Sequence, residues 1–371
     1  MVDVVPDLAH ATLDKRACPD CGGDLEWNAA KQALVCPYCG TVAPWKPGDA
    51  APAIAELDLT QALAKADDGG RGYGDARREV QCQSCRAISV FDADRVADRC
   101  AFCGSPAIVP YAALKEAITP QSLLPFRITD TQVRESIRRW YGTRWFAPNK
   151  LKRVALTDTL RGVYLPYWTF DAQVHAAWTA EAGHYYYTSE RVLRNGRWET
   201  QQVRHIRWEP ASGELDHYFD DALVPGSEGA HADLLQKIAP FPTTTDLQAY
   251  APEFVRGWTV ERYQVDLRQA ADLNMADMER AVRELCAAQV PGDTQRNLEV
   301  HATYRGRTFK HVLMPVWLVS YTYGRRAFQL LVNGYTGAIA GQRPYSAIKI
   351  ALAVIAALVV VIAYIWLDNA R

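Results

Sequence analysis

Four Cys-x-x-Cys pairs constrain this chain more than any other feature of its sequence. Fourteen residues separate the two pairs in each half, so the pattern C-x2-C-x14-C-x2-C occurs twice, one residue short of the usual zinc-ribbon spacing. Paired tight turns of this kind aim four thiolates at one point, which is how a structural Zn²⁺ ion is held. We therefore expect two structural zinc ions, bound by Cys18, Cys21, Cys36, Cys39 and by Cys82, Cys85, Cys100, Cys103.

Two other uses of the cysteines fit the sequence less well. Disulfides need an oxidising compartment, and the first residues show no basic segment followed by an apolar run. A thioredoxin-like site needs one Cys-x-x-Cys pair, not four in matched sets. Arg86 stands where a glycine commonly follows Cys85, which leaves the geometry of that turn open. The ninth cysteine, Cys286, lies in an apolar helical stretch and is expected to be a buried thiol.

The C-terminal end carries the second strong signal. Residues 350–367 form 18 positions without a charge, and a helix of that length rises about 27 Å, close to the thickness of a bilayer core. A buried core helix would show a polar face, and this segment shows none. Arg325, Arg326, Arg343 and Lys349 precede it. The positive-inside rule then predicts a tail-anchored, single-pass protein of the cell inner membrane, with most of the chain in the cytoplasm.

The rest of the chain predicts a mixture of helices and strands. A helix is expected over 131–141, capped by Asp130 or Thr129, and a second over 262–289. Residues 162–182 and 203–208 predict strands, joined through a hairpin turn at Asn195-Gly196. Asn333-Gly334 predicts another turn.

The expected fold class is therefore α+β: two small four-cysteine zinc ribbons, an α+β domain with an antiparallel sheet, and one C-terminal transmembrane helix. The expected divisions are zinc ribbon 1 (1–46), a linker with a short helix (47–79), zinc ribbon 2 (80–110), the α+β domain (111–345) and the transmembrane helix (346–368).

A short internal echo relates 162–168 (GVYLPYW) to 311–317 (HVLMPVW). Each segment carries a proline, and because proline cannot donate to a sheet ladder, we expect both segments to begin a strand or to lie at an edge. Duplication of a helix-plus-sheet unit is one explanation of the echo.

Several segments together carry a resemblance to a known family. They are the paired ribbons, Leu123–Phe126, Arg144–Pro148, Gly162–Ala172, Pro291–Thr294, Val332–Gly337 and Arg343–Ser346 before the hydrophobic tail. The chain resembles the bacterial TFIIB-type zinc-ribbon membrane proteins found beside PspA and flotillin-like (SPFH) membrane-stress proteins, which are often labelled primosomal helicase-like. The resemblance implies a membrane adaptor that recruits SPFH and PspA-type partners during envelope stress, and it brings no catalytic residue. The sequence leaves the oligomeric state open, including a homo- or hetero-oligomer.

The sequence also lacks the motifs of common enzymes. No Gly-Lys dipeptide is present, hence no Walker A loop, and neither His-Glu-x-x-His nor Gly-x-Ser-x-Gly occurs. Four histidines lie on strand-like segments near acids such as Asp171 and Glu181, and they leave a hidden enzyme site as a minor alternative; they are His175, His184, His205 and His217. Asp220-Asp221 is expected to be a solvated turn. We expect no enzyme.

A basic segment interleaved with aromatic residues is the remaining candidate site. Its cations are Arg134, Arg138, Arg139, Arg144, Lys150, Lys152 and Arg153. Such a segment suits phosphates with base stacking, or anionic lipid headgroups, or simply a solvated helix face. The solvated face is favoured, then a lipid or acidic partner, and nucleic acid least. A membrane-tethered nucleic-acid-binding protein is therefore the alternative to the adaptor.

Overall fold

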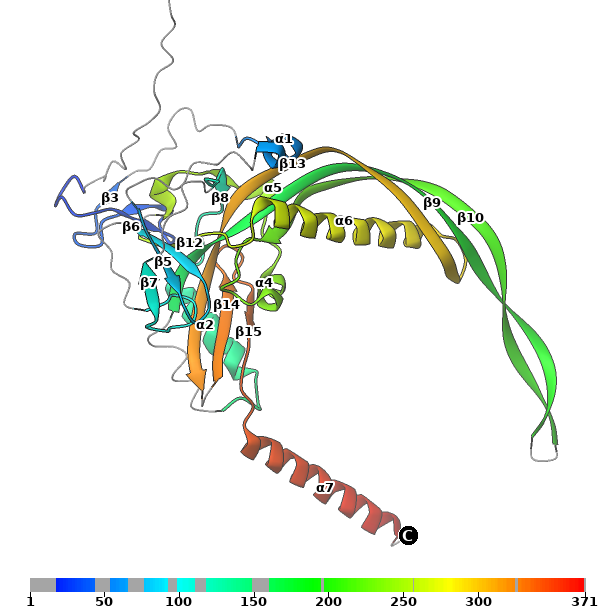
Figure 1. The fold of residues 1–371 in the computed structure, drawn as a ribbon. Coiled ribbons are helices and arrows are strands. Elements are labelled where there is room, and N and C mark those ends of the chain that lie inside the picture. Colours follow the sequence, from blue (N-terminus) through cyan, green and yellow to red (C-terminus); the bar gives the residue numbers. More distant parts are fainter. Residues whose placement is uncertain are drawn as a thin grey trace, which may run out of the picture.

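The computed structural model describes residues 18–43, 54–65, 77–92, 99–110, 118–148, 160–194, 197–255, 257–323 and 326–369. Figure 1 shows a body that contains both cysteine-rich segments, a long curved arm that leaves the body, and the C-terminal helix α7. The expected α+β class with two four-cysteine clusters and a C-terminal apolar helix is confirmed. The Asn195-Gly196 turn and basic residues Lys150, Lys152 and Arg153 lie outside the described residues.

Most strands join one large sheet, and a small sheet (β1–β2–β3) belongs to the first cysteine cluster. The strands are β1 (Glu26–Asn28), β2 (Ala33–Val35), β3 (Val42–Ala43), β4 (Leu57–Asp58), β5 (Arg77–Cys82), β6 (Ile88–Asp92), β7 (Ile108–Pro110), β8 (Ser122–Leu123), β9 (Leu160–Arg194), β10 (Arg197–Pro225), β11 (Gln248–Ala249), β12 (Thr259–Glu261), β13 (Thr294–Tyr323), β14 (Arg326–Asn333) and β15 (Ile339–Gly341). The large sheet runs β11-β8-β13-β9-β12-β6-β5-β7, with β10 on β9, β14 on β13, β15 on β14 and β4 on β13. Its pairs are antiparallel, as expected, except for the short parallel contacts β12–β9 and β13–β8.

The helices follow local signals in the sequence. They are α1 (Leu59–Lys65), α2 (Asp130–Gly142), α4 (Ala232–Ile238), α5 (Thr243–Asp246), α6 (Leu267–Gln289) and α7 (Ala347–Asn369), with the 3-10 helix η2 (Pro252–Val255). Thr129 caps α2 in a capping box with Gln132, which confirms the expected start. Helix α6 begins at Leu267, after the cap Asp266, and not at Arg262. Its apolar stripe packs under the arm, and Cys286 within the stripe is buried, as expected.

The two echoing segments lie side by side at the centre of the sheet. Strands β9 and β13 are antiparallel here, with Leu165 opposite Met314. Around this point β12 runs parallel to β9, just as β8 runs parallel to β13. Each long strand follows a short strand and a helix and is followed by its own hairpin partner. The echo thus corresponds to a repeated unit of short strand, helix, long strand and returning strand, and each short strand pairs with the other unit's long strand.

The two prolines of the echo are inside these strands, so the expectation that they begin a strand or lie at an edge was wrong. Pro166 lies where the neighbour of β9 changes from β12, at Tyr164, to β10, at Tyr167. Pro315 lies at the matching place, where the neighbour of β13 changes from β8 to β14. A ladder is interrupted at such a change, so a residue without an N–H group is tolerated there.

The arm is the outer part of the β9–β10 hairpin. Strand β13 accompanies β9 out to the pair Thr294–Gly183. Beyond Gly183 only β9 and β10 remain paired, up to Arg194 and Arg197, so the outer arm is a two-stranded ribbon. The sequence patterns predicted strands of 21 and 6 residues here, whereas β9 has 35 residues and β10 has 29.

Asp221 is buried in an ion cluster, so the expected solvated turn was wrong. It lies at an irregularity in β10, with φ +52°, and its backbone N–H donates to Asp171 Oδ1 at 2.7 Å. The ammonium group of Lys310 lies 2.7 Å from Asp221 Oδ1 and 3.2 Å from Glu56 Oε1. Asp171, Asp220 and Asp221 could together approach a metal ion. Lys310 already supplies a cation beside Asp221, so the cluster is explained as a structural ion network.

Replacing Lys310 with methionine is therefore expected to destabilise the protein strongly. The side chains of Lys310 and Asp221 are 7% and 2% exposed, so the change leaves a buried carboxylate without its cation, at a cost of about 3–5 kcal/mol. Denaturant unfolding followed by circular dichroism measures this cost. Arg280→Met is the control, because Arg280 pairs with Asp277 on the surface and such pairs contribute at most about 1 kcal/mol. Equal costs for the two variants would contradict the structural role of the buried network.

His311 couples the stability of the sheet to pH. Its Nδ1 lies 2.8 Å from the carbonyl oxygen of Ile118, its ring stacks on Trp168, and burial lowers its pKa to about 4. The unfolded chain therefore binds a proton near pH 6.5 that the folded chain binds only near pH 4. The free energy of unfolding is therefore not reduced by His311 above pH 6.5, and it falls as the pH decreases from 6.5 toward 4.

We expect His311→Asn to remove this dependence. The wild-type free energy of unfolding should fall by about 2 kcal/mol between pH 7.5 and pH 5 through this residue, and the variant should lack that part of the slope. Denaturant titrations at several pH values measure the slope. His231→Asn, which changes an exposed histidine, is the control. A variant slope equal to that of wild type would refute the assignment.

Candidate metal centres and membrane anchor

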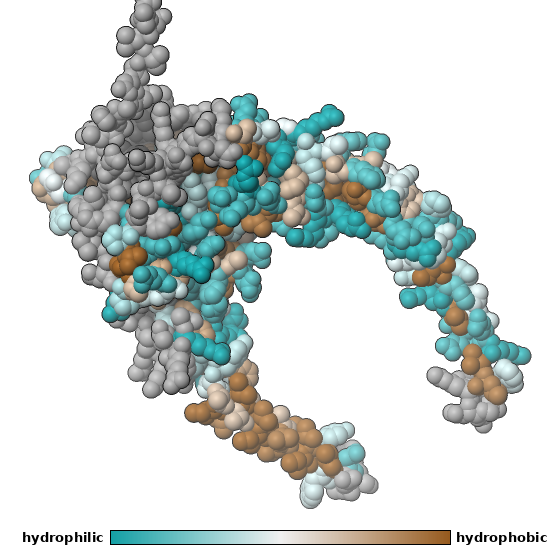
Figure 2. All heavy atoms as spheres, in the orientation of Figure 1, coloured by the Kyte–Doolittle hydropathy of each residue, from teal (hydrophilic) through white to brown (hydrophobic). Residues whose placement is uncertain are grey.

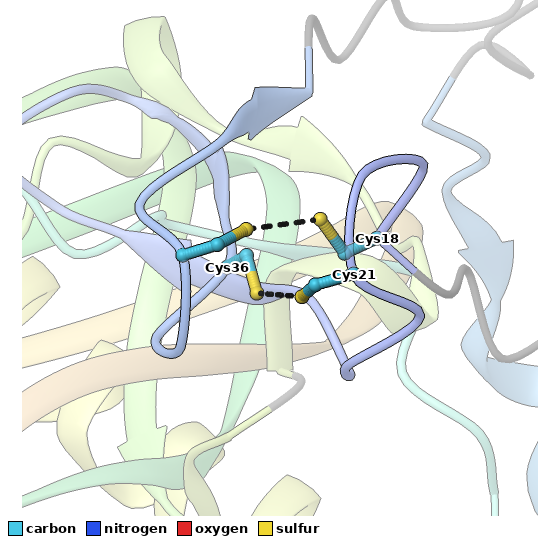
Figure 3. Close-up of side chains that lie close together, drawn as sticks. Cys18, Cys21 and Cys36 are labelled. Carbon is cyan, nitrogen blue, oxygen red and sulfur yellow. Dashed lines mark hydrogen bonds between the residues drawn. The ribbon is translucent and has the colours of Figure 1, made fainter.

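The first four-cysteine cluster, which we call ribbon 1 (residues 18–43), brings its sulfurs to one point. The Sγ atoms of Cys18 and Cys39 are 3.4 Å apart, as are those of Cys21 and Cys36 (Figure 3). These short contacts run between the two turns, and all four sulfurs lie within 4.8 Å of one another. A tetrahedral ion with Zn–S bonds of about 2.3 Å needs sulfurs about 3.8 Å apart, whereas a disulfide needs about 2.0 Å. The geometry fits a four-thiolate metal site.

The second cluster, ribbon 2 (residues 77–110), repeats this geometry. Its Sγ–Sγ distances are 3.5 Å between Cys82 and Cys103 and 3.6 Å between Cys85 and Cys100. Arg86 adopts φ +63° and its N–H donates to the carbonyl oxygen of Cys82 at 2.8 Å. Gly22 of ribbon 1 makes the equivalent bond to Cys18 with φ +73°. The turn geometry that Arg86 left open in the sequence is thus the same in both ribbons.

Individual thiols of the two clusters differ in acidity. Hydrogen bonds from the side chain and backbone of Thr41 lower the pKa of Cys39 to about 6. In ribbon 2, burial raises the pKa of Cys103 to about 11. A divalent cation at the centre favours the thiolate form of all four ligands, so metal binding releases protons. Both clusters could hold a metal ion, and the four thiolate donors suit Zn²⁺.

Both ribbons are attached to the body. In ribbon 1, Trp27 packs edge-to-face on Phe254, with ring centroids 4.7 Å apart, and Gln32 Nε2 donates to the carbonyl oxygen of Phe126 at 2.8 Å. Ribbon 2 extends the large sheet, because its strand β6 pairs with β12. Its fully buried Phe102 lies in the core, and the carbonyl oxygen of this residue accepts a hydrogen bond from Gln329 Nε2 at 3.1 Å.

Helix α7 is long and apolar enough to cross a membrane, and among the described residues it is the one helix that passes this test. None of its apolar window is buried, and Figure 2 shows the helix as a continuous hydrophobic surface standing away from the body. This exposure separates it from a core helix of a soluble protein, which would be mostly covered. The helix is compatible with a single-pass anchor, as the sequence predicted.

The described part of the basic segment lies beside the start of α7. Lys349 Nζ donates to the carbonyl oxygens of Trp145 and Ala147, both at 2.9 Å. The N–H of Ser346 donates to the carbonyl oxygen of Phe146 at 2.8 Å. Trp145 is 77% exposed at this junction. The sequence did not reveal this contact, because the two segments are about 200 residues apart in the chain.

The cations of this segment have different surroundings. Arg134 and Arg139 pair with acids one turn away on α2, Asp130 and Glu135. Arg144 stacks over the ring of Trp140, while Arg138 is exposed. The described part of the segment is therefore only partly neutralised.

The four strand histidines do not form a single site. His175 lies 2.9 Å from Asp216, and His205 lies 2.7 Å from the hydroxyl oxygen of Thr188. His184 lies 3.9 Å from Glu209, and His217 packs against the ring of Phe219. The contacts are spread along β9 and β10. They thus give no support to the minor alternative of an enzyme site built from these histidines.

Comparison with known proteins adds one relative. No family model matches the chain, and no solved structure matches it. The chain is 24% identical over 337 residues to the uncharacterized protein YdjG of Bacillus subtilis (strain 168), and this match covers 90% of the chain and 91% of the relative. The similarity therefore extends over most of the chain.

Proposed function

We propose that this protein is a non-enzymatic, tail-anchored adaptor that recruits partner proteins to the cytosolic face of the bacterial inner membrane. The observation that carries the proposal is the combination of two four-thiol metal sites, both packed on one sheet body, with an uncovered apolar C-terminal helix. The resemblance to zinc-ribbon membrane proteins suggests flotillin-like (SPFH) and PspA-like partners in an envelope-stress response.

In this proposal each cluster holds one Zn²⁺ ion with a structural role. Four thiolates complete a tetrahedral shell, whereas catalytic zinc sites keep a position open for water or substrate. The described residues offer all four ligands at each site, from turns that are themselves hydrogen-bonded. The metal therefore stabilises the fold, and the ribbons present rigid surfaces for protein contacts.

Anchoring supplies the mechanism of the adaptor. A partner that binds the ribbons is confined to the membrane surface, which raises its effective concentration for further assembly there. The positive charges before α7 support a body on the cytosolic side, where thiols remain reduced and able to bind metal.

The position of the basic segment favours lipid over nucleic acid. Arg144 lies near Arg343 and Tyr345, just before the start of α7, at the level where lipid headgroups surround a membrane helix. Trp145 lies beside them, and exposed tryptophans are enriched at this level of a bilayer. The segment then holds the body against an anionic membrane surface.

Affinity purification tests the adaptor function. The full-length protein, solubilised in detergent from its native cells, is compared by mass spectrometry with a version that lacks residues 350–367. Recovery of SPFH or PspA-like proteins, reduced without the helix, is the expected result. Recovery of replication or RNA-processing proteins with nuclease-sensitive nucleic acid would overturn the proposal in favour of a membrane-tethered nucleic-acid-binding protein.

A further inference from the structure

The outer arm exposes large apolar side chains on a two-stranded ribbon. Beyond Gly183 it has two strands, and among the described residues no third strand covers it. Isolated two-stranded ribbons are at best marginally stable in water. Near the outer end, Leu193 lies directly opposite Trp198, and these side chains are 56% and 68% exposed. We therefore expect the outer arm to bind another surface that covers these side chains.

The two faces of the arm differ in chemistry. Successive residues of a strand alternate between faces, and directly opposed residues share one. One face, which we call the aromatic face, therefore carries Tyr185, Tyr187, Arg191, Leu193, Trp198, Arg204, Ile206 and Trp208. No acidic residue occupies a position on this face between 183 and 208. Glu190 and Glu209 both stand on the opposite face.

The aromatic face combines cations with aromatic rings. The guanidinium of Arg204 lies over the ring of Tyr185, 4.4 Å from its centroid. Arg191 is exposed two residues before Leu193, and Tyr187 is 60% exposed. Tryptophan and tyrosine concentrate at the interface of a bilayer, and arginine near the surface is attracted to anionic lipid. The chemistry of this face matches an anionic membrane surface.

The arm also points toward the membrane that α7 would occupy. In Figure 1 the arm arches away from the body and its outer end turns down to the same side as α7, level with that helix. A bilayer surface that meets the start of α7 can therefore also meet the outer end of the arm.

We propose that the outer end of the arm is a second membrane contact, in which Leu193 and Trp198 insert into the interface of an anionic leaflet while Arg191 and Arg204 face its headgroups. This inference rests on α7 being a membrane anchor, as the proposed function requires. The two contacts together fix the body as an arch over the membrane. The orientation of both ribbons relative to the bilayer then becomes constant, which suits an adaptor that must present its partners at a defined height.

The test uses the full-length protein in lipid nanodiscs. Hydrogen–deuterium exchange of peptides from 185–206 is measured in discs of phosphatidylcholine alone and in discs with about one third phosphatidylglycerol. We expect exchange several-fold slower in the anionic discs, because insertion keeps the arm's backbone hydrogen bonds closed. The variant Leu193→Glu/Trp198→Glu should lose this protection.

A matched control separates membrane contact from hairpin stability. Thr188→Glu/Val203→Glu introduces the same charge at a directly opposed pair on the opposite face, and it should keep the lipid-dependent protection. Exchange that is equally fast in both discs for the wild-type arm, or equal loss of protection in both variants, would overturn the proposal and point to an acidic protein as the occupant. Failure of α7 to anchor would appear separately, as a chain that does not enter nanodiscs.

Discussion

Replacing Cys100 with serine is expected to unfold ribbon 2 and to destabilise the adjoining part of the body. The same change at Cys36 is expected to unfold ribbon 1 alone. Structural zinc contributes about 10–16 kcal/mol in small four-ligand modules, which is as large as the whole stability of a typical domain. The serine variant loses one thiolate and with it most of this energy. We expect the bound zinc to fall from two ions to one in either variant, measured by elemental analysis of purified protein.

The two variants should differ because the ribbons are attached differently. Ribbon 2 extends the large sheet through the β6–β12 pair, and its Phe102 fills part of the core beside Gln329. Ribbon 1 has its own small sheet and touches the body through side-chain contacts. Faster exchange should therefore spread from residues 77–110 to 259–261 in Cys100→Ser but remain within 18–43 in Cys36→Ser.

The ninth cysteine provides the control for this comparison. Cys286 is buried on α6 against apolar side chains, far along the chain from either cluster. Cys286→Ser should keep two zinc ions. Both ribbon variants should also remain attached to membranes, because α7 is a separate element. Loss of attachment in Cys36→Ser would contradict this division of roles.

The sequence predicted those features that depend on short-range spacing. The cysteine pairs predicted both clusters because a tight turn places two sulfurs within a few residues. The start of α2 followed from the capping box that Thr129 forms with Gln132. Helix α7 followed from a run of apolar residues longer than any other in the chain.

Features that depend on distant pairing were not predicted. The sequence pattern predicted a strand over 162–182, whereas β9 continues to Arg194, where β10 is its pairing partner. Asp221 is buried because Lys310, 89 residues later, provides its cation. Pro166 is tolerated inside a strand because two neighbours meet beside it. Each of these needs the tertiary arrangement, which the sequence pattern does not contain.

Deleting residues 347–371 is expected to move the protein from the membrane fraction to the soluble fraction. The deleted helix has no buried side chain in its apolar window, so its loss should leave the fold of the body intact. Circular dichroism and zinc content of the truncated protein check that fold. Separation of membranes in alkaline carbonate, which removes peripheral proteins, measures the attachment of the full-length chain.

The same truncation separates the two membrane contacts. An 18-residue apolar helix gives insertion that salt does not reverse, whereas the aromatic face of the arm binds through a few interfacial and electrostatic contacts. The truncated protein should therefore bind vesicles containing phosphatidylglycerol weakly, and about 0.5 M salt should release it because charges are screened over a few ångströms. Full-length protein that leaves the membrane in carbonate would show that α7 is not a span, and the arm would then be the stronger contact.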